Sequence, residues 1–225
     1  GVTNKLLAKK ACKICVAYEG MERFFEKEKI ILTGNPVRQG LLESKITREE
    51  AIQKFGLSPE KKTVLIIGGS LGARTINQSV LQNLEKISQS GIQFISQTGK
   101  YYFEDIKATM KASGEYPMLH VTDFISDMSA AYKAADLVIS RAGAGSISEF
   151  CLLQKPVILV PSPNVAEDHQ TKNALALVKK DAAIYVKDNE AVASLIDKAI
   201  DTVQKSEELK KLSMNIACLA LKDSA

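Results

Sequence analysis

Two short glycine-rich stretches contain residue types that could bind an anion. GGSLGA at 68–73 and RAGAGS at 141–146 each follow an apolar run and precede a helical pattern. A helix that begins at such a turn leaves its first backbone N–H groups without partners, and its dipole attracts negative charge. GGSLGA is neither a Gly-x-Gly-x-x-Gly nor a P-loop motif. It is therefore explained equally well as a tight turn that packs a helix against its strand.

Glu149 could have either of two roles. Ser146 and Glu149 show the Ser-x-x-Glu spacing of a capping box, in which both side chains satisfy the start of a helix. Alternatively, a carboxylate in the first helical turn that faces the open edge of a sheet could accept hydrogen bonds from two ribose hydroxyls. An acidic residue does this in dinucleotide-binding folds, although there it follows the next strand. The spacing alone leaves both roles open.

A third polar segment, VPSPNVAEDHQTKNA at 160–174, leads from an apolar run into a helical pattern. His169, Gln170 and Asn173 lie at the start of that pattern, where imidazole and amide groups could bind sugar hydroxyls. The alternative is a solvated helix start with Asp168 as its N-cap.

Apolar runs of strand length alternate with helical patterns through most of the chain. Strands are predicted at 14–17, 30–33, 63–67, 92–96, 118–121, 137–140, 157–160 and 183–186. Helices are predicted at 74–88, 102–112, 127–134, 146–153 and 168–178, with further helical segments at 4–13 and 207–221. Most strands are rich in Val, Ile and Leu, which is typical of parallel strands covered on both faces. We therefore expect an α/β fold with a doubly wound parallel sheet and with its ligand sites at the carboxyl ends of the strands.

The pattern changes between residues 33 and 62, where we expect a domain boundary. TGNPVRQG at 33–40 interrupts the alternation with glycine and proline, and Thr47 and Glu50 have the spacing of a capping box. A new α/β unit begins at Thr63. The segment before the boundary is too short to be a domain of its own, and the chain stops within a helical pattern. We expect the chain to be a piece of a longer protein.

Composition excludes several classes of protein. The chain of 225 residues has a formal net charge of +4, without a dense block of Lys or Arg, so nucleic-acid binding is not predicted. Its apolar runs are too short to span a bilayer. Cys12 and Cys15 form a Cys-x-x-Cys pair without a second pair, and His120 and His169 have no ligand spacing, so a zinc site is not expected. Reduced thiols of a cytosolic protein explain the cysteines better.

Five motifs in order resemble the MurG family of bacterial N-acetylglucosaminyltransferases. They are TGNPVR at 33–38, IGGSLGAR at 67–74, VTDFISDM at 121–128, RAGAGSISE at 141–149 and EDHQTKNA at 167–174. The resemblance spans essentially the whole chain. It implies the glycosyltransferase B architecture of two Rossmann-like domains. Residues 1–33 would be the tail of the N-terminal acceptor domain, 34–62 the interdomain linker with a connecting helix, and 63–225 the C-terminal UDP-sugar-binding domain.

The resemblance also implies which residues bind the diphosphate of the donor. Arg38 matches the linker arginine that reaches the diphosphate, and Ser70 is similar to a serine that contacts phosphate. Ala144, Gly145 and Ser146 match a loop whose backbone amides meet the phosphates. Ile147 and Ser148 continue this segment and are included in the expected donor site.

Further roles follow from the same resemblance. Ile125 is similar to the residue whose backbone pairs with the uracil edge, and Phe124 beside it is as well explained as core. Glu149 matches the ribose-binding carboxylate. Gln170 matches the glutamine that binds the N-acetylglucosamine hydroxyls, and His169 stands where relatives have glutamine or histidine. Arg74 and Arg141 could be surface charges or helix-packing groups.

The implied reaction is an inverting transfer of N-acetylglucosamine from UDP-N-acetylglucosamine to the muramic-acid 4-hydroxyl of lipid I, which gives lipid II. Neither a cofactor nor a metal is implied, and no catalytic residue is expected within this chain, which is the donor-binding half and is expected to be inactive alone. The implied location is peripheral, on the cytoplasmic face of the bacterial inner membrane, and no nucleic-acid partner is expected. Two alternatives stay open: a UDP-N-acetylglucosamine 2-epimerase and a non-catalytic nucleotide-sugar-binding module.

Overall fold

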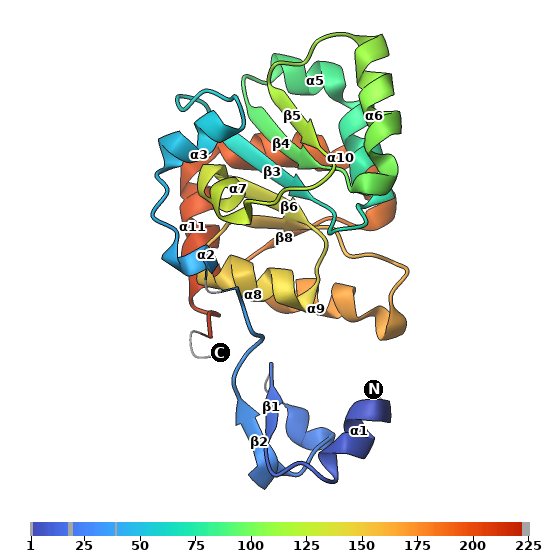
Figure 1. Cartoon of the computed structure of the whole chain (residues 1–225), viewed down its shortest axis with the longest axis vertical. Helices are drawn as coiled ribbons and strands as arrows, with labels where there is room; N and C mark the ends of the chain where they lie inside the picture. The colour runs from blue at the N-terminus through green and yellow to red at the C-terminus, as the bar shows by residue number, and fades with distance from the viewer. Residues whose placement is uncertain (1, 18–19, 39, 222–225) are drawn as a thin grey trace.

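The computed structural model describes residues 2–17, 20–38 and 40–221, without the side chains of Val2 and Ala166. Residues 1, 18–19, 39 and 222–225, which fall within the predicted domains, lie outside these ranges. A small N-terminal part lies below a larger α/β part, and a single irregular segment of chain joins them (Figure 1). None of the helices described is long and apolar enough to cross a membrane.

The larger part is built on a six-stranded sheet of order β5-β4-β3-β6-β7-β8, in which every neighbouring pair is parallel. The strands are β3 (Thr63–Ile67), β4 (Gln93–Gln97), β5 (Leu119–Thr122), β6 (Leu137–Ser140), β7 (Val157–Leu159) and β8 (Ile184–Tyr185). The chain moves outward from β3 to β5, then returns to the other side of β3 to form β6. This order is that of a doubly wound Rossmann-like sheet, whose switch point lies between β3 and β6. The predicted parallel α/β fold is confirmed.

Helices cover both faces of the sheet because successive strand residues point to opposite sides. Val64 and Ile66 of β3 pack into a core with one group of helices, whereas Leu65 and Ile67 pack into a second core on the other face. The first group is α4 (Arg74–Gln82), α5 (Leu84–Gln89), α6 (Lys100–Ser113) and α10 (Asp188–Gln204). The second group is α3 (Arg48–Lys54), α7 (Met128–Ala134), α8 (Ala144–Leu152) and α9 (His169–Val178). Helix α11 (Ser206–Ala217) contributes to both cores, with Leu209 in the first and Ile216 in the second.

Three features of these helices were predicted wrongly. The helix predicted at 74–88 is two helices, because the chain leaves helical geometry at Asn83, whose amide donates to Ser79 O at 2.8 Å and to Val192 O at 3.4 Å. Helix α10 was not predicted, although its buried residues recur at helical spacing from Ala191 to Val203. The terminal helix α11 ends at Ala217, earlier than expected.

The segment that leads from the linker into the large sheet contains α2 (Gly40–Glu43) and α3, which already packs on the larger part. The predicted capping box at the start of α3 is confirmed: the Thr47 hydroxyl accepts from Glu50 N, and the Glu50 carboxylate accepts from Thr47 N. Arg48 then donates to the Asp136 carboxylate at 2.9 Å, and the same carboxylate accepts from Thr63 N at 2.8 Å. These contacts hold α3 against the amino-terminal edge of the sheet. The proposed domain limits at 33 and 62 stay a prediction.

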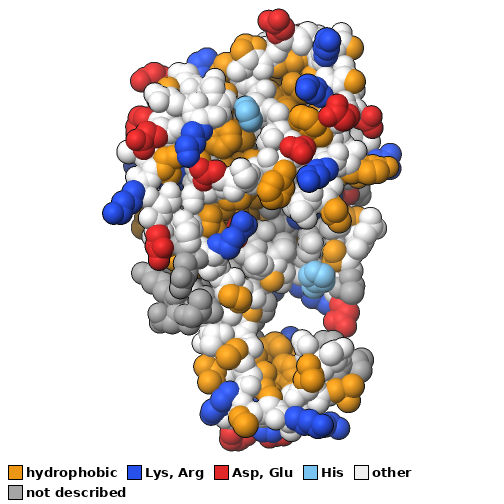
Figure 2. Space-filling view, viewed as in Figure 1, with side chains coloured by type: hydrophobic (Ala, Val, Ile, Leu, Met, Phe, Trp, Pro, Cys, Tyr) orange, Lys and Arg blue, Asp and Glu red, His pale blue; other side chains and the backbone are white. Residues whose placement is uncertain are grey.

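The N-terminal part consists of α1 (Val2–Ala8), β1 (Ile14–Val16), two short 3₁₀ turns and β2 (Ile30–Leu32). The helix predicted at 4–13 therefore ends at Ala8. Strands β1 and β2 pair in parallel as a two-stranded sheet. Hydrophobic side chains gather on the surface of this part (Figure 2). Exposed ones include Leu6, Leu7, Phe24, Ile31 and Leu32.

Candidate functional site

A cavity of about 1020 Å³ lies at the carboxyl ends of the strands and is lined on both sides of the switch point. Its lining comes from the segments that follow β3, β4, β5, β6 and β7, together with Arg38 of the linker. Of the predicted donor-site residues, Arg38, Ser70, Ile125, Gly145, Ser146, Glu149 and Gln170 line it. Ala144, Ile147, Ser148 and His169 are not among its lining residues.

Helix α8 begins earlier than the sequence predicted. Gly143 is its N-cap and Ala144 its first residue, and the first bond across this helix start runs from Ile147 N to Gly143 O. Glu149 therefore lies in the second turn, where the backbone N–H groups already have helical partners. The capping box, one of the two roles that the spacing left open for Ser146 and Glu149, is excluded, since Gly143 is the N-cap and the helix start has no side-chain cap.

The early start of α8 leaves the N–H groups of residues 144–146 without helical acceptors, at the edge of the cavity. A Cβ added to Gly145 would meet no other atom within 4 Å, so this edge is open. Helix dipole and unpaired N–H groups together make the start of α8 suited to an anion.

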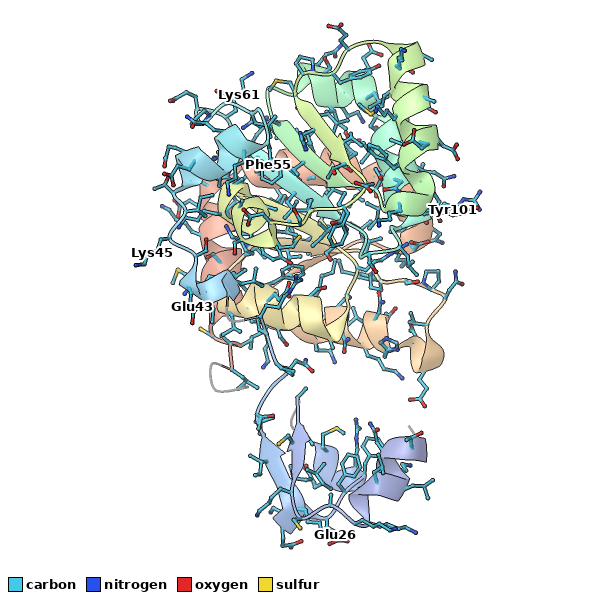
Figure 3. All side chains as sticks on the ribbon, viewed as in Figure 1. Glu26, Glu43, Lys45, Phe55, Lys61 and Tyr101 are labelled. Atoms are coloured by element: carbon cyan, nitrogen blue, oxygen red, sulfur yellow. The ribbon has the colours of Figure 1, made fainter. Side chains whose placement is uncertain are left out.

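The turn at 68–73 is constrained by its own packing. Gly72 has φ +79°, and an added Cβ would lie 2.0 Å from Thr98 O. A Cβ on Gly68 would lie 2.5 Å from Ala73 N. The turn is therefore needed for packing, while its outer residues Ser70 and Leu71 line the cavity. The side chains around this turn are drawn in Figure 3, where the label Tyr101 marks the start of α6, the helix that follows β4.

Both oxygens of the Glu149 carboxylate are in contact with other side chains. The hydroxyl of Tyr132 donates to Oε2 at 2.7 Å, and an Arg38 guanidinium nitrogen lies 3.5 Å from Oε1. The Glu149 side chain is 14% exposed, so the carboxylate is largely enclosed at the cavity wall. Burial of Tyr132, followed by the effect of the Glu149 charge, raises the pKa of the phenol. Sequence reasoning missed Tyr132 because the pair joins two different helices.

The backbone N–H of Ile125 already has a hydrogen-bond partner within the protein. Its N–H donates to the Gln97 side chain at 2.9 Å, and the Gln97 amide donates to Gly69 O at 3.1 Å. Gln97 therefore connects the segments after β3 and β5, a role that sequence reasoning missed. Phe124 is 49% exposed and lines the cavity, so of the two explanations left open for it the core is excluded.

The segment before α9 differs from the helix start that the sequence suggested. Asp168 is the N-cap residue of α9, as the alternative explanation had it, but it has φ 49° and its side chain makes no cap bond. The Gln170 side-chain oxygen accepts from Ser162 N at 2.9 Å, which holds Gln170 at the cavity wall. Asn173 donates to Ala142 O at 3.1 Å and so supports the turn before α8. His169 is exposed at the first position of α9.

Arg141 is bound within the protein. Its guanidinium donates to Val160 O at 2.9 Å and to Pro161 O at 3.2 Å, and it pairs with Asp188 at 2.5 Å. Thr75 donates to the other oxygen of Asp188 at 2.9 Å. Arg141 therefore joins the ends of β6 and β7 to α4 and α10, whereas Arg74 is exposed at the cavity.

The linker docks on α8. The Asn35 amide donates to the Ser148 hydroxyl at 3.1 Å and to Ala144 O at 3.4 Å. Ile147 of the same helix is buried in the core. Helix α8 thus presents one surface to the core, another to the linker, and its first turn to the cavity. Among the described residues, no group of three His, Cys, Asp or Glu side chains could hold a metal ion.

The sheet order and the two glycine turns at its switch point define a Rossmann-like domain with a ligand cavity at the carboxyl ends of its strands. Residues 63–225 match the family model described as the glycosyltransferase family 28 C-terminal domain. The chain belongs to this family.

Relatives of this chain share a name. A protein of Phocaeicola vulgatus is 74% identical and one of Bacteroides fragilis 68% identical, each over the whole of this chain. Both are named UDP-N-acetylglucosamine–N-acetylmuramyl-(pentapeptide) pyrophosphoryl-undecaprenol N-acetylglucosamine transferase. The chain spans 60% of the length of each. The resemblance to the MurG family is confirmed.

Solved structures show the same fold. MurG of Acinetobacter baumannii is 26% identical with a TM-score of 0.70, and the match covers 98% of this chain and 59% of that one. A UDP-GlcNAc 2-epimerase of Neisseria meningitidis, solved with UDP-GlcNAc bound, has a TM-score of 0.71 at 16% identity, covering 99% of this chain and 61% of that one. The second likeness concerns the fold alone.

Proposed function

We propose that this chain is the donor-binding part of a transferase that moves N-acetylglucosamine from UDP-N-acetylglucosamine to a muramyl-pentapeptide carried on a lipid diphosphate. The observation that supports this most directly is the cavity at the switch point, where the open start of α8 lies beside Glu149. The relatives named above supply the identity of donor and acceptor.

In this proposal the diphosphate lies between the two glycine turns. The N–H groups of residues 144–146 donate to it, and Ser70 contacts it from the turn after β3. Arg38 has a side chain that is 67% exposed and a weak contact to Glu149, so it can turn toward the phosphates. Fixed N–H dipoles and a cation then offset the charge of the diphosphate.

For the ribose, the uracil and the sugar of the donor, we propose contacts with residues that line the cavity. Glu149 accepts hydrogen bonds from the ribose hydroxyls, and the uracil lies against Phe124 and the carbonyl of Ile125, whose N–H already donates to Gln97. The sugar lies toward Gln170. The family resemblance supports a position of His169 near the sugar, although His169 is not among the residues that line the cavity.

The proposed chemistry is an inverting displacement. The muramic-acid 4-hydroxyl attacks the anomeric carbon, the bond from that carbon to the β-phosphate oxygen breaks, and UDP leaves with the bonding electrons. The hydroxyl proton passes to a base outside this chain. Negative charge that develops on UDP is stabilised by the start of α8 and by Arg38, and preorganised donors of this kind commonly contribute several kcal/mol.

The acceptor and the location are also proposals. The relatives named above act, by their name, on an undecaprenol-linked substrate, so the complete protein would meet its acceptor at the surface of a membrane. We place it peripherally at the cytoplasmic face of the inner membrane, with no nucleic-acid partner.

Calorimetric titration of the chain with UDP, UDP-N-acetylglucosamine and ADP-ribose tests the donor site. We expect saturable binding of the two uridine nucleotides and none of ADP-ribose. Glu149→Ala should weaken UDP binding by about tenfold or more, the effect of losing hydrogen bonds to a charged group. Glu60→Ala removes an exposed glutamate outside the cavity and serves as the matched control. Absence of saturable UDP binding would overturn the proposal.

The likeness to an epimerase fold makes one comparison necessary. An epimerase converts UDP-N-acetylglucosamine without an acceptor, whereas a transferase releases UDP only when the lipid-linked acceptor is present. The complete protein should therefore release UDP from the donor in an acceptor-dependent manner. Conversion of the donor alone to its 2-epimer would favour the epimerase, and binding without any turnover would favour a non-catalytic module.

A further inference from the structure

Tyr132 of α7 and Glu149 of α8 form a hydrogen bond across two helices that both pack on the sheet. The phenol oxygen lies 2.7 Å from Glu149 Oε2. Tyr132 is 2% exposed, so its hydroxyl reaches the cavity wall from inside the core. Neither the sequence motifs nor the comparisons give this residue a role.

The direction and the geometry of this bond are fixed. An ionised carboxylate only accepts hydrogen bonds, so the phenol is the donor. Burial and the nearby carboxylate raise the pKa of Tyr132, which keeps the phenol protonated throughout the neutral range. The Tyr132 ring packs edge-on against Phe150, with centroids 6.0 Å apart and an interplanar angle of 82°. A buried ring held in this way cannot move its hydroxyl far from Glu149.

The two oxygens of the Glu149 carboxylate have different partners. Oε2 accepts from Tyr132, whereas the contact of Oε1 among the described residues is with the exposed guanidinium of Arg38, at the longer distance of 3.5 Å. A glutamate side chain free to rotate would lose rotamer freedom when a ligand bound it. Tyr132 removes that cost in advance because it holds the carboxylate before the ligand arrives.

We propose that Tyr132 is a positioning residue that orients Glu149 toward the ribose diol of the donor and so contributes to selection of a ribonucleotide. The inference rests on the proposed function, since it takes Glu149 to be the ribose acceptor. The competing explanation is purely structural: a buried tyrosine needs a partner for its hydroxyl, and Glu149 supplies one. That explanation predicts the same loss of affinity for every ligand.

Two nucleotides separate these explanations. UDP carries both ribose hydroxyls, and 2′,3′-dideoxyuridine diphosphate carries neither, so only UDP binding uses Glu149. We expect the wild-type chain to bind UDP at least about tenfold more tightly than the dideoxy nucleotide. Tyr132→Phe should weaken UDP binding by about tenfold and change binding of the dideoxy nucleotide by less than about twofold. Tyr116→Phe is the matched control, because that hydroxyl donates to Ser113 O at a surface outside the cavity.

A double-mutant cycle tests whether Tyr132 acts through Glu149. If it does, the variant carrying both Tyr132→Phe and Glu149→Ala binds UDP as weakly as Glu149→Ala alone. If Tyr132→Phe does not fold, Phe150→Leu loosens the Tyr132 ring while keeping the hydroxyl, and a smaller loss confined to UDP is expected.

Equal weakening of both nucleotides by Tyr132→Phe, unchanged UDP affinity, or additive effects in the cycle would each overturn the inference. A wild-type chain that binds both nucleotides equally would instead remove Glu149 from the ribose role, and the inference would fall with it. That result appears in the wild-type titration alone, so the two failures are distinguishable.

Discussion

At the scale of single residues, glycine shapes the edge of the cavity. The backbone there adopts a conformation that other residues rarely take. Gly72 has a positive φ, and its α-carbon lies against the carbonyl of Thr98. Gly145 differs, because it has open space around it and lies within α8. The first glycine is required by the protein's own packing, and the second is not.

Gly72→Ala should lower the free energy of unfolding by several kcal/mol, because the added Cβ would lie 2.0 Å from Thr98 O and the backbone would also be strained. Gly145→Ala should leave that free energy unchanged or raise it by up to about 1 kcal/mol, as expected for alanine in a helix. Denaturant unfolding of both variants measures the difference. Equal stabilities of the two variants would contradict this account of the turn.

At the scale of elements, helix starts decide where side chains point. Helix α7 begins at Met128 with Asp127 as its N-cap, and the Asp127 carboxylate accepts from Ala130 N at 3.0 Å and from the Lys54 amine at 2.7 Å. Helix α7 carries Tyr132, and Lys54 belongs to α3. One carboxylate therefore ties the connecting helix α3 to the helix that supports Glu149.

Asp127→Ala should destabilise the chain by about 1 kcal/mol at neutral pH, the usual effect of losing an N-cap. Hydrogen bonds from Lys54 and Ala130 lower the pKa of Asp127 in the folded chain. The stabilisation is therefore fully present above the unfolded pKa of about 3.9 and is lost as pH falls through the lower folded value. Unfolding of wild type and variant between pH 7 and pH 2.5 measures the gap, which should close with acid. A gap that stayed constant would exclude the ionised carboxylate as its source.

At the scale of the whole molecule, the larger α/β part has its own two cores, and the N-terminal part contributes little to them. The residues of those cores begin at Leu41, with Val37 packed against the edge. The described residues 2–17 and 20–33 instead contain a two-stranded sheet and exposed apolar side chains. The linker meets α8 through Asn35 and Arg38, which lie outside this N-terminal part.

Removal of residues 1–33 should therefore leave the thermal midpoint of the larger part and its UDP affinity unchanged. Both depend on residues that the shorter chain retains. Scanning calorimetry and titration of a chain that begins at residue 34 measure these quantities. Limited proteolysis of the full chain should cut first within residues 1–33. A large drop in the midpoint would show that the N-terminal part supports the core.

Prediction from the sequence succeeded where the signal is local. Val-, Ile- and Leu-rich runs marked each strand of the large sheet, and the Thr47–Glu50 capping box was recognised from spacing alone. It failed at Asn83, where a side chain breaks a helix by bonding Ser79 O and Val192 O. It also missed α10, although the helical spacing of its apolar residues was available.

What the sequence by itself determined is the succession along the chain of the strands and of most helices, the glycine turns and the presence of Glu149 after the second turn, because periodicity and turn chemistry are encoded within a few neighbouring residues. Only the tertiary structure decided what those residues contact. Tyr132 reaches Glu149, Gln97 holds Ile125 N, and Arg141 pairs with Asp188 across gaps in the chain that no local pattern spans. Such contacts arise when the sheet brings the carboxyl ends of its strands to one edge.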